Sequence, residues 1–101
     1  MSEFTTVAKV SDIESGQGKV VKVNGHDVAL FKIGSEFYAI ENTCPHRQGP
    51  LGEGYLAGEI VTCPWHGWQF DVKTGQSQMG PGKVKTYSVK VEGEDVKVSL
   101  N

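Results

Sequence analysis

A chain of 101 residues has the length of one domain, and its formal net charge of −2 lacks the excess of basic side chains that nucleic-acid binding requires. Its N-terminal residues do not have the basic and apolar regions of a secretion signal, and no run of about 18 apolar residues is present. We therefore expect a soluble, cytoplasmic protein with no membrane or nucleic-acid partner. Two cysteines are too few for a secreted disulfide scaffold, which favours a metal-binding or catalytic use.

Thirteen glycines and four prolines divide the chain into short segments, and no segment of helical length has an apolar period of 3.6 residues. The first part of the chain predicts one helical turn within residues 11–17 and four strands. These strands are expected at residues 4–10, 19–23, 26–33 and 36–41. The strongest hairpin signal is Asn24-Gly25, because both residues tolerate the positive φ of a type I′ turn. With a second turn at Gly34-Ser35, the segments predict a three-stranded meander.

The last part of the chain also predicts strands, at residues 84–91 and 96–100. In the second of them, Val96, Val98 and Leu100 alternate with polar residues and so share one face. The two ends of the chain are therefore expected to pair in one antiparallel barrel or sandwich.

The middle of the chain is less regular, because glycine and proline interrupt the alternation between residues 42 and 70. Only residues 59–62 and 67–70 have the pattern of strands. A long irregular stretch in a compact domain argues for a functional insertion. We predict a single all-β domain, residues 1–101, in which a β base (residues 1–42 and 71–101) carries a small inserted subdomain (residues 43–70).

Both cysteines lie in this insertion, and each is followed by a proline and a histidine. The motifs are C-P-H at residues 44–46 and C-P-W-H at residues 63–66, in the pattern C-x-H-x16-C-x-x-H. Two loops that each carry one thiolate and one imidazole can converge on a common site. The prolines stiffen the loops, while Gly49 and Gly67 allow the backbone to approach an anion such as sulfide.

Two kinds of metal site are compatible with the side chains of Cys44, His46, Cys63 and His66. One is a structural, redox-silent zinc ion with tetrahedral coordination. The other is a 2Fe-2S cluster in which one iron takes both cysteines and the other takes both histidines. Zinc sites usually pair like with like, as C-x2-4-C and H-x3-5-H, whereas each loop here mixes a cysteine with a histidine. The mixed pairing favours a two-iron site with chemically different ends.

The two motifs, C-P-H and the longer C-P-W-H-G-W at residues 63–68, resemble the cluster-binding motifs of Rieske 2Fe-2S proteins, and the resemblance covers nearly the whole chain. In size the chain is similar to the soluble Rieske ferredoxins that supply oxygenases with electrons. The resemblance implies a Rieske-like antiparallel β base, in which residues 43–70 are a cluster-binding subdomain holding one 2Fe-2S cluster per chain. It also implies a one-electron carrier, not an enzyme, whose partners are a flavoprotein ferredoxin reductase and a terminal oxygenase.

The resemblance further assigns the ligands. Cys44 and Cys63 would bind the inner iron, and His46 and His66 the outer, solvent-facing iron through Nδ1. With only two thiolates the oxidised site is neutral, so an electron enters more easily than in a four-cysteine cluster. Because imidazole binds in its neutral form, acid should release the metal.

Respiratory Rieske proteins differ from this sequence near the cluster. They carry an additional, disulfide-forming cysteine in each motif, where this chain has Gly49 and Trp65. They also direct a serine and a tyrosine hydroxyl at the cluster sulfurs, where this chain has Trp68 and Phe70. Without these two donors the reduced site is less stabilised, which predicts a low potential of roughly −150 mV.

Other residues have less decided interpretations. Arg47 is either a solvated cation or a contact for an acidic partner, and Trp65 is either a core residue or a partner-facing anchor. Residues 80–82 are either an ordinary turn or a third loop over the cluster. We expect His26 to be exposed and to take no part in the site.

Two alternative functions remain open. The same fold resembles the small subunit of an assimilatory nitrite reductase, although many of those lack the ligands. In the other alternative, the four side chains hold zinc in a structural module that binds proteins. The sequence shows no Ser-His-Asp arrangement, P-loop or dinucleotide fingerprint, so catalysis by the chain itself is not expected.

Overall fold

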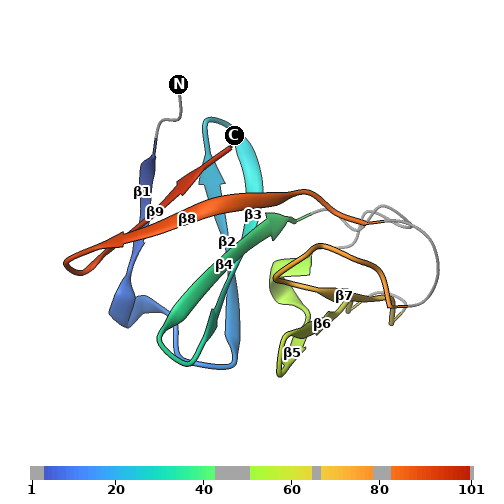
Figure 1. Ribbon diagram of the computed structural model, residues 1–101. Helices are drawn as coiled ribbons and strands as arrows, with labels where there is room; N and C mark the ends of the chain where they lie inside the picture. Colours follow the sequence, from blue (N-terminus) through green and yellow to red (C-terminus); the bar gives the residue numbers. More distant parts are fainter. Residues whose placement is uncertain (1–3, 43–50, 65–66, 79–82, 101) are drawn as a thin grey trace.

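The computed structural model describes residues 4–42, 51–64, 67–78 and 83–100, and within these residues it contains strands and two short 3-10 helices but no α-helix (Figure 1). The strands are β1 (Thr5–Lys9), β2 (Gln17–Val23), β3 (His26–Ile33), β4 (Glu36–Glu41), β5 (Tyr55–Ala57), β6 (Ile60–Thr62), β7 (Gln69–Asp71), β8 (Thr86–Glu92) and β9 (Asp95–Ser99). The 3-10 helices are η1 (Val10–Asp12) and η2 (Leu51–Glu53). The prediction of an all-β fold is confirmed.

The larger sheet has six antiparallel strands in the order β1-β9-β8-β4-β3-β2. Its first and last strands, β1 and β2, contact each other, so the sheet curls into a nearly closed barrel (Figure 1). The predicted meander is present as β2, β3 and β4. As expected, the two ends of the chain meet in this barrel, where β9 pairs with both β1 and β8.

Two-residue loops connect the strands of the meander. Asn24 and Gly25 join β2 to β3 with φ values of 50° and 84°, the positive values that a type I′ turn requires. Gly34 begins the next loop at φ 63° and is followed by Ser35. Both hairpin predictions are confirmed, because these turns depend on local residue types alone.

A smaller antiparallel sheet, in the order β5-β6-β7, lies beside the barrel (Figure 1). The strands expected at residues 59–62 and 67–70 correspond to β6 and β7, each shifted by one or two residues. The short strand β5 was not predicted. Its signal in the sequence is the two-residue loop Gly58-Glu59, in which Gly58 has φ 61° and which joins β5 to β6.

Two hydrophobic cores share the strands β3 and β4. Alternate side chains of β3 enter different cores: Val28 and Leu30 point into the barrel, whereas Ala29 and Phe31 point toward the smaller sheet. The barrel core contains Ala8, Ile13, Val21, Val23, Val28, Leu30, Phe37, Ala39, Val96 and Val98. The second core contains Ala29, Phe31, Ile40, Leu51, Val61, Cys63, Phe70, Val72 and Val84. The second core therefore attaches the smaller sheet to the barrel.

The connection from β1 to β2 places one side chain inside the barrel. Ile13 follows η1 and is 2% exposed. Replacing Ile13 with valine removes one buried methylene, so we expect the free energy of unfolding to fall by about 0.5–1.5 kcal/mol in urea denaturation. The matched control is Ile33→Val at the half-buried end of β3, where the same change should cost less. Equal losses at both positions would contradict the assignment of Ile13 to the core.

Candidate metal centre

Of the four predicted ligands, Cys63 lies in the described part of the chain. It directly follows β6, has a free thiol and is 1% exposed within the second core. The segment that includes Cys44 and His46 and the one that includes His66 lie outside the described residues, as do Arg47, Gly49, Trp65 and the loop at residues 80–82.

The loop that begins at Cys63 is closed by two backbone hydrogen bonds. The amide of Cys63 donates to the carbonyl oxygen of Trp68 at 2.7 Å, and the amide of Gly67 donates to the carbonyl oxygen of Cys63 at 3.1 Å. Gly67 adopts φ 80°, a conformation that costs residues with a side chain roughly 1 kcal/mol or more. The glycine of the second motif thus makes a tight return of the chain beside the buried thiol.

Two of the four positions at which the sequence differs from respiratory Rieske proteins, Trp68 and Phe70, lie at the end of the same loop. Trp68 is half-buried, and its ring centroid lies 6.4 Å from that of Phe70. Phe70 is fully buried in the second core together with Cys63. Because phenylalanine has no hydroxyl, this position offers no hydrogen bond to a cluster sulfur. The low potential stays a prediction.

The residues on either side of the segment 43–50, which contains the first motif, are hydrogen-bonded to each other. The residue responsible is Asn42, which no sequence motif marks. Asn42 precedes residues 43–50, and Leu51 and Gly52 follow them. The backbone oxygen of Asn42 accepts a hydrogen bond from the Leu51 amide at 2.7 Å, and its side-chain Oδ1 accepts one from the Gly52 amide at 2.8 Å. The chain therefore leaves the barrel and returns to it at almost the same point.

The backbone of Gly54, after the first motif, comes close to the backbone of Thr62, just before the second motif. The amide of Gly54 donates to the carbonyl oxygen of Leu51 at 3.0 Å, and Gly54 lies directly against Thr62 of β6. A Cβ atom at Gly54 would overlap the carbonyl oxygen of Thr62. The glycine thus allows the segment that follows the first motif to lie beside the residue that precedes Cys63.

A set of polar side chains on the surface connects the smaller sheet to the barrel. Lys73, just after β7, forms an ion pair with Glu59 at 2.8 Å, and its Nζ lies 5.5 Å from the centroid of the Tyr38 ring on β4. The hydroxyl of Tyr38 donates to Glu36 at 2.6 Å. The hydrogen bond to Glu59 raises the pKa of Lys73, and the hydrogen bond to Glu36 raises the pKa of Tyr38. Both groups therefore stay protonated at neutral pH.

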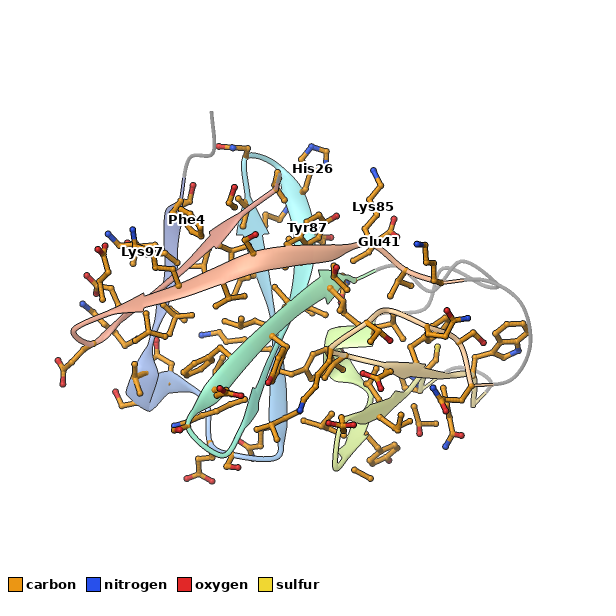
Figure 2. The ribbon with its side chains drawn as sticks, viewed as in Figure 1. Phe4, His26, Glu41, Lys85, Tyr87 and Lys97 are labelled. Carbon is orange, nitrogen blue, oxygen red and sulfur yellow. The ribbon has the colours of Figure 1, made fainter. Side chains whose placement is uncertain are left out.

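His26 lies in the described part of the chain, and its predicted exposure is confirmed. It is exposed at the start of β3, and Figure 2 shows its ring pointing away from the smaller sheet. In residues 4–42, 51–64, 67–78 and 83–100, no group of three or more His, Cys, Asp or Glu side chains is arranged to hold a metal ion. Besides Cys63 and His26, the cysteine and histidines of the chain are Cys44, His46 and His66.

The described residues fit an iron–sulfur cluster. Cys63 supplies a thiol that the apolar second core shields from water, and Gly67 turns the backbone tightly beside it. Thiolate is the ligand that such clusters use, and a dry apolar surround protects them.

Sequence comparison identifies relatives over nearly the whole chain. The pattern of the family described as "Rieske [2Fe-2S] domain" matches residues 3–97. The ferredoxin component of naphthalene 1,2-dioxygenase/salicylate 5-hydroxylase systems from a Ralstonia species is 38% identical over 95 residues, which cover 92% of this chain and 91% of the relative.

Solved structures agree with the sequence relatives. The ferredoxin of carbazole 1,9a-dioxygenase from Nocardioides aromaticivorans IC177 superposes with a TM-score of 0.91 at 30% identity, covering 97% of this chain and 98% of that one. A chain in a complex of reduced oxygenase and oxidised ferredoxin in carbazole 1,9a-dioxygenase gives a TM-score of 0.88 at 33% identity, with 95% and 92% covered.

The fold and the buried thiol, together with these similarities, define an iron–sulfur electron-transfer protein. More particularly, the chain belongs to the Rieske [2Fe-2S] domain family. It takes one 2Fe-2S cluster per chain and acts as an electron carrier, not as an enzyme. Within the described residues, no helix is both long enough and apolar enough to cross a membrane.

Proposed function

We propose that the chain is the Rieske ferredoxin of an oxygenase system, working in the cytoplasm. It receives single electrons from a flavoprotein reductase and delivers them to a terminal oxygenase. The observation that carries this proposal is the buried Cys63 thiol, held in a chain that aligns end to end with dioxygenase ferredoxins. The carbazole 1,9a-dioxygenase complex supports the second partner, because a ferredoxin of the same fold is there bound to its oxygenase.

We further propose that Cys44 and Cys63 bind one iron and that His46 and His66 bind the other. The burial of Cys63 supports its place on the inner iron. The two C-P-x motifs support the other assignments, because they carry the second cysteine and two of the three histidines of the chain. The base, residues 1–42 and 71–101, then serves as the rigid support of a cluster-binding subdomain at residues 43–70.

The chain's own residues hold the site and keep it dry. When bound, the cluster takes up and releases one electron. The amide hydrogen bond to the carbonyl oxygen of Trp68 holds the backbone of Cys63, and its side chain packs in the second core. A packed, preorganised site needs little reorganisation when its charge changes, which suits a one-electron carrier.

Elemental analysis tests this proposal against the zinc-binding module. We expect two irons and two acid-labile sulfides per chain, a visible spectrum that bleaches on reduction by dithionite, and a titrated potential toward roughly −150 mV. One zinc ion without sulfide would contradict the proposal. A potential above zero would contradict the inference from Trp68 and Phe70 but leave the carrier function intact. Reduction by a flavoprotein ferredoxin reductase, followed by oxidation by an oxygenase, separates the carrier from a nitrite reductase subunit.

A further inference from the structure

Asn42 occupies an unusual position at the end of β4. Its side chain is polar and yet only 7% exposed, and it makes the 2.8 Å hydrogen bond to the Gly52 amide across ten residues of chain. The preceding residue is also fixed: the Glu41 amide donates to the carbonyl oxygen of Lys85 at 2.9 Å, and the Lys85 amide donates to a Glu41 carboxylate oxygen at 3.3 Å. Figure 2 shows Glu41 and Lys85 together at this end of β4 and β8. The residue before Asn42 is therefore held firmly in the barrel.

Its partner, Gly52, is held equally firmly. A Cβ atom at Gly52 would lie 2.6 Å from Cγ2 of Val20 and 3.0 Å from Oδ1 of Asn42, so the backbone packs directly on β2. On the same strand, Gly18 leaves room for the ring of Phe31, and a Cβ atom there would be 3.3 Å from the carbonyl oxygen of Gly52. Leu51, next to Gly52, is fully buried in the second core. The side-chain oxygen of Asn42 thus accepts a hydrogen bond from a backbone amide, that of Gly52, whose position is fixed by packing on β2.

The contacts continue from Gly52 to the second motif. Gly54 lies against the carbonyl of Thr62, and Tyr55 pairs with Thr62 in the ladder of β5 and β6. Thr62 is followed at once by Cys63. The described contacts therefore lead from Asn42 through residues 51–54 to Thr62, the residue before Cys63. Asn42 is thus bonded to Leu51 and Gly52, and Gly54 lies against the residue before Cys63.

We propose that Asn42 is a positioning residue of the cluster site, whose side-chain oxygen sets the spacing between the first motif and Cys63. The proposal deepens the function proposed above and rests on it, because it takes Cys44 and His46 as ligands. Asn42 itself is not proposed as a ligand. Its hydrogen bond closes the base of the segment that carries two of them, so that loss of this bond lets the first pair of ligands move relative to the second.

The test is the retention of the cluster in Asn42→Ala. Removing the acceptor leaves the Gly52 amide buried without its side-chain partner, which is unfavourable for a buried donor. We expect cluster loss to an iron chelator at neutral pH to become at least about tenfold faster, the equivalent of 1.4 kcal/mol. The circular dichroism and electron paramagnetic resonance spectra of the remaining cluster should also change. In Asn42→Asp, which keeps an oxygen acceptor at the same place, the rate should return to within about threefold of the parent.

Ser15→Ala is the matched control, because Ser15 Oγ also accepts a hydrogen bond from a glycine amide, that of Gly34, at 2.8 Å. This contact lies between other loops of the barrel, so its loss should leave the rate and the spectra unchanged. Suppose that the parent protein contains its cluster but that Asn42→Ala loses the cluster no faster than Ser15→Ala. That result would overturn the inference about Asn42 and leave the proposed function intact. So would an Asn42→Asp variant as labile as Asn42→Ala. A parent protein without iron and sulfide would overturn the proposed function as well.

Discussion

Replacing Cys63 with serine should remove the cluster and abolish electron transfer through the protein. The thiolate of Cys63 is one of two proposed thiolate ligands, and a serine hydroxyl does not ionise near neutral pH to take its place. The new hydroxyl also replaces a thiol that is 1% exposed in an apolar core, where an unpaired polar group costs about 1–3 kcal/mol. The measurements are iron and sulfide content, the visible spectrum, and reductase-dependent electron delivery.

Val61→Thr is the control for this substitution. Val61 lies on β6, the strand that Cys63 directly follows, is fully buried in the same core, and has nearly the shape of threonine. Its replacement therefore introduces a buried hydroxyl two residues from Cys63 without touching a sulfur. We expect a less stable protein that still contains its iron and sulfide. A Cys63→Ser protein with normal iron and sulfide would show that Cys63 is not a ligand.

The parts of the fold that the sequence predicted are those that neighbouring residues determine. Asn24-Gly25 specifies a turn by its own conformational preferences, and the alternation of Val96 and Val98 specifies a strand with one buried face. The three residues of β5 offer too short a pattern to stand out. They form a strand because η2 and β6 bring them into register, with Tyr55 opposite Thr62 and Ala57 opposite Ile60.

The residues of the candidate site likewise fall into those that a sequence motif predicts and those that only tertiary contacts reveal. The sequence predicts Cys63 as a ligand because a cysteine followed by proline and histidine has a chemical meaning before the chain folds, and its burial is consistent with that prediction. Asn42 and Gly54 carry no such signal, since asparagine and glycine are common in loops. Their importance comes from tertiary contacts: Asn42 bonds to an amide ten residues away, and Gly54 meets a carbonyl eight residues away in β6. The residues that position a site are thus harder to predict than the residues that bind at it.

Gly54→Ala should have the second largest effect on the protein. The added methyl group would overlap the carbonyl oxygen of Thr62 and would lie 3.2 Å from the carbonyl oxygen of Leu51. Both obstacles are backbone atoms, so no side-chain rotation relieves the overlap and the segment η2–β5 must move away from β6. Overpacking of this kind typically costs about 1–3 kcal/mol. We expect a loss at the upper end of that range in urea denaturation, together with a clear fall in iron content, because Leu51 leaves the core that surrounds Cys63.

The comparison that isolates this cause is Gly58→Ala, in the two-residue loop of the same β5–β6 hairpin. There the methyl group would meet no atom within 4 Å, and the cost comes from the positive φ of 61° alone, about 1 kcal/mol. Gly58→Ala should therefore lose some stability but keep a full complement of iron, whereas Gly54→Ala should lose both. If the two variants keep equal iron, the contact between Gly54 and Thr62 does not control the site, and the spacing of the motifs must be set elsewhere in the chain. If only Gly54→Ala loses iron, the close approach of Gly54 to Thr62 is necessary for holding the cluster.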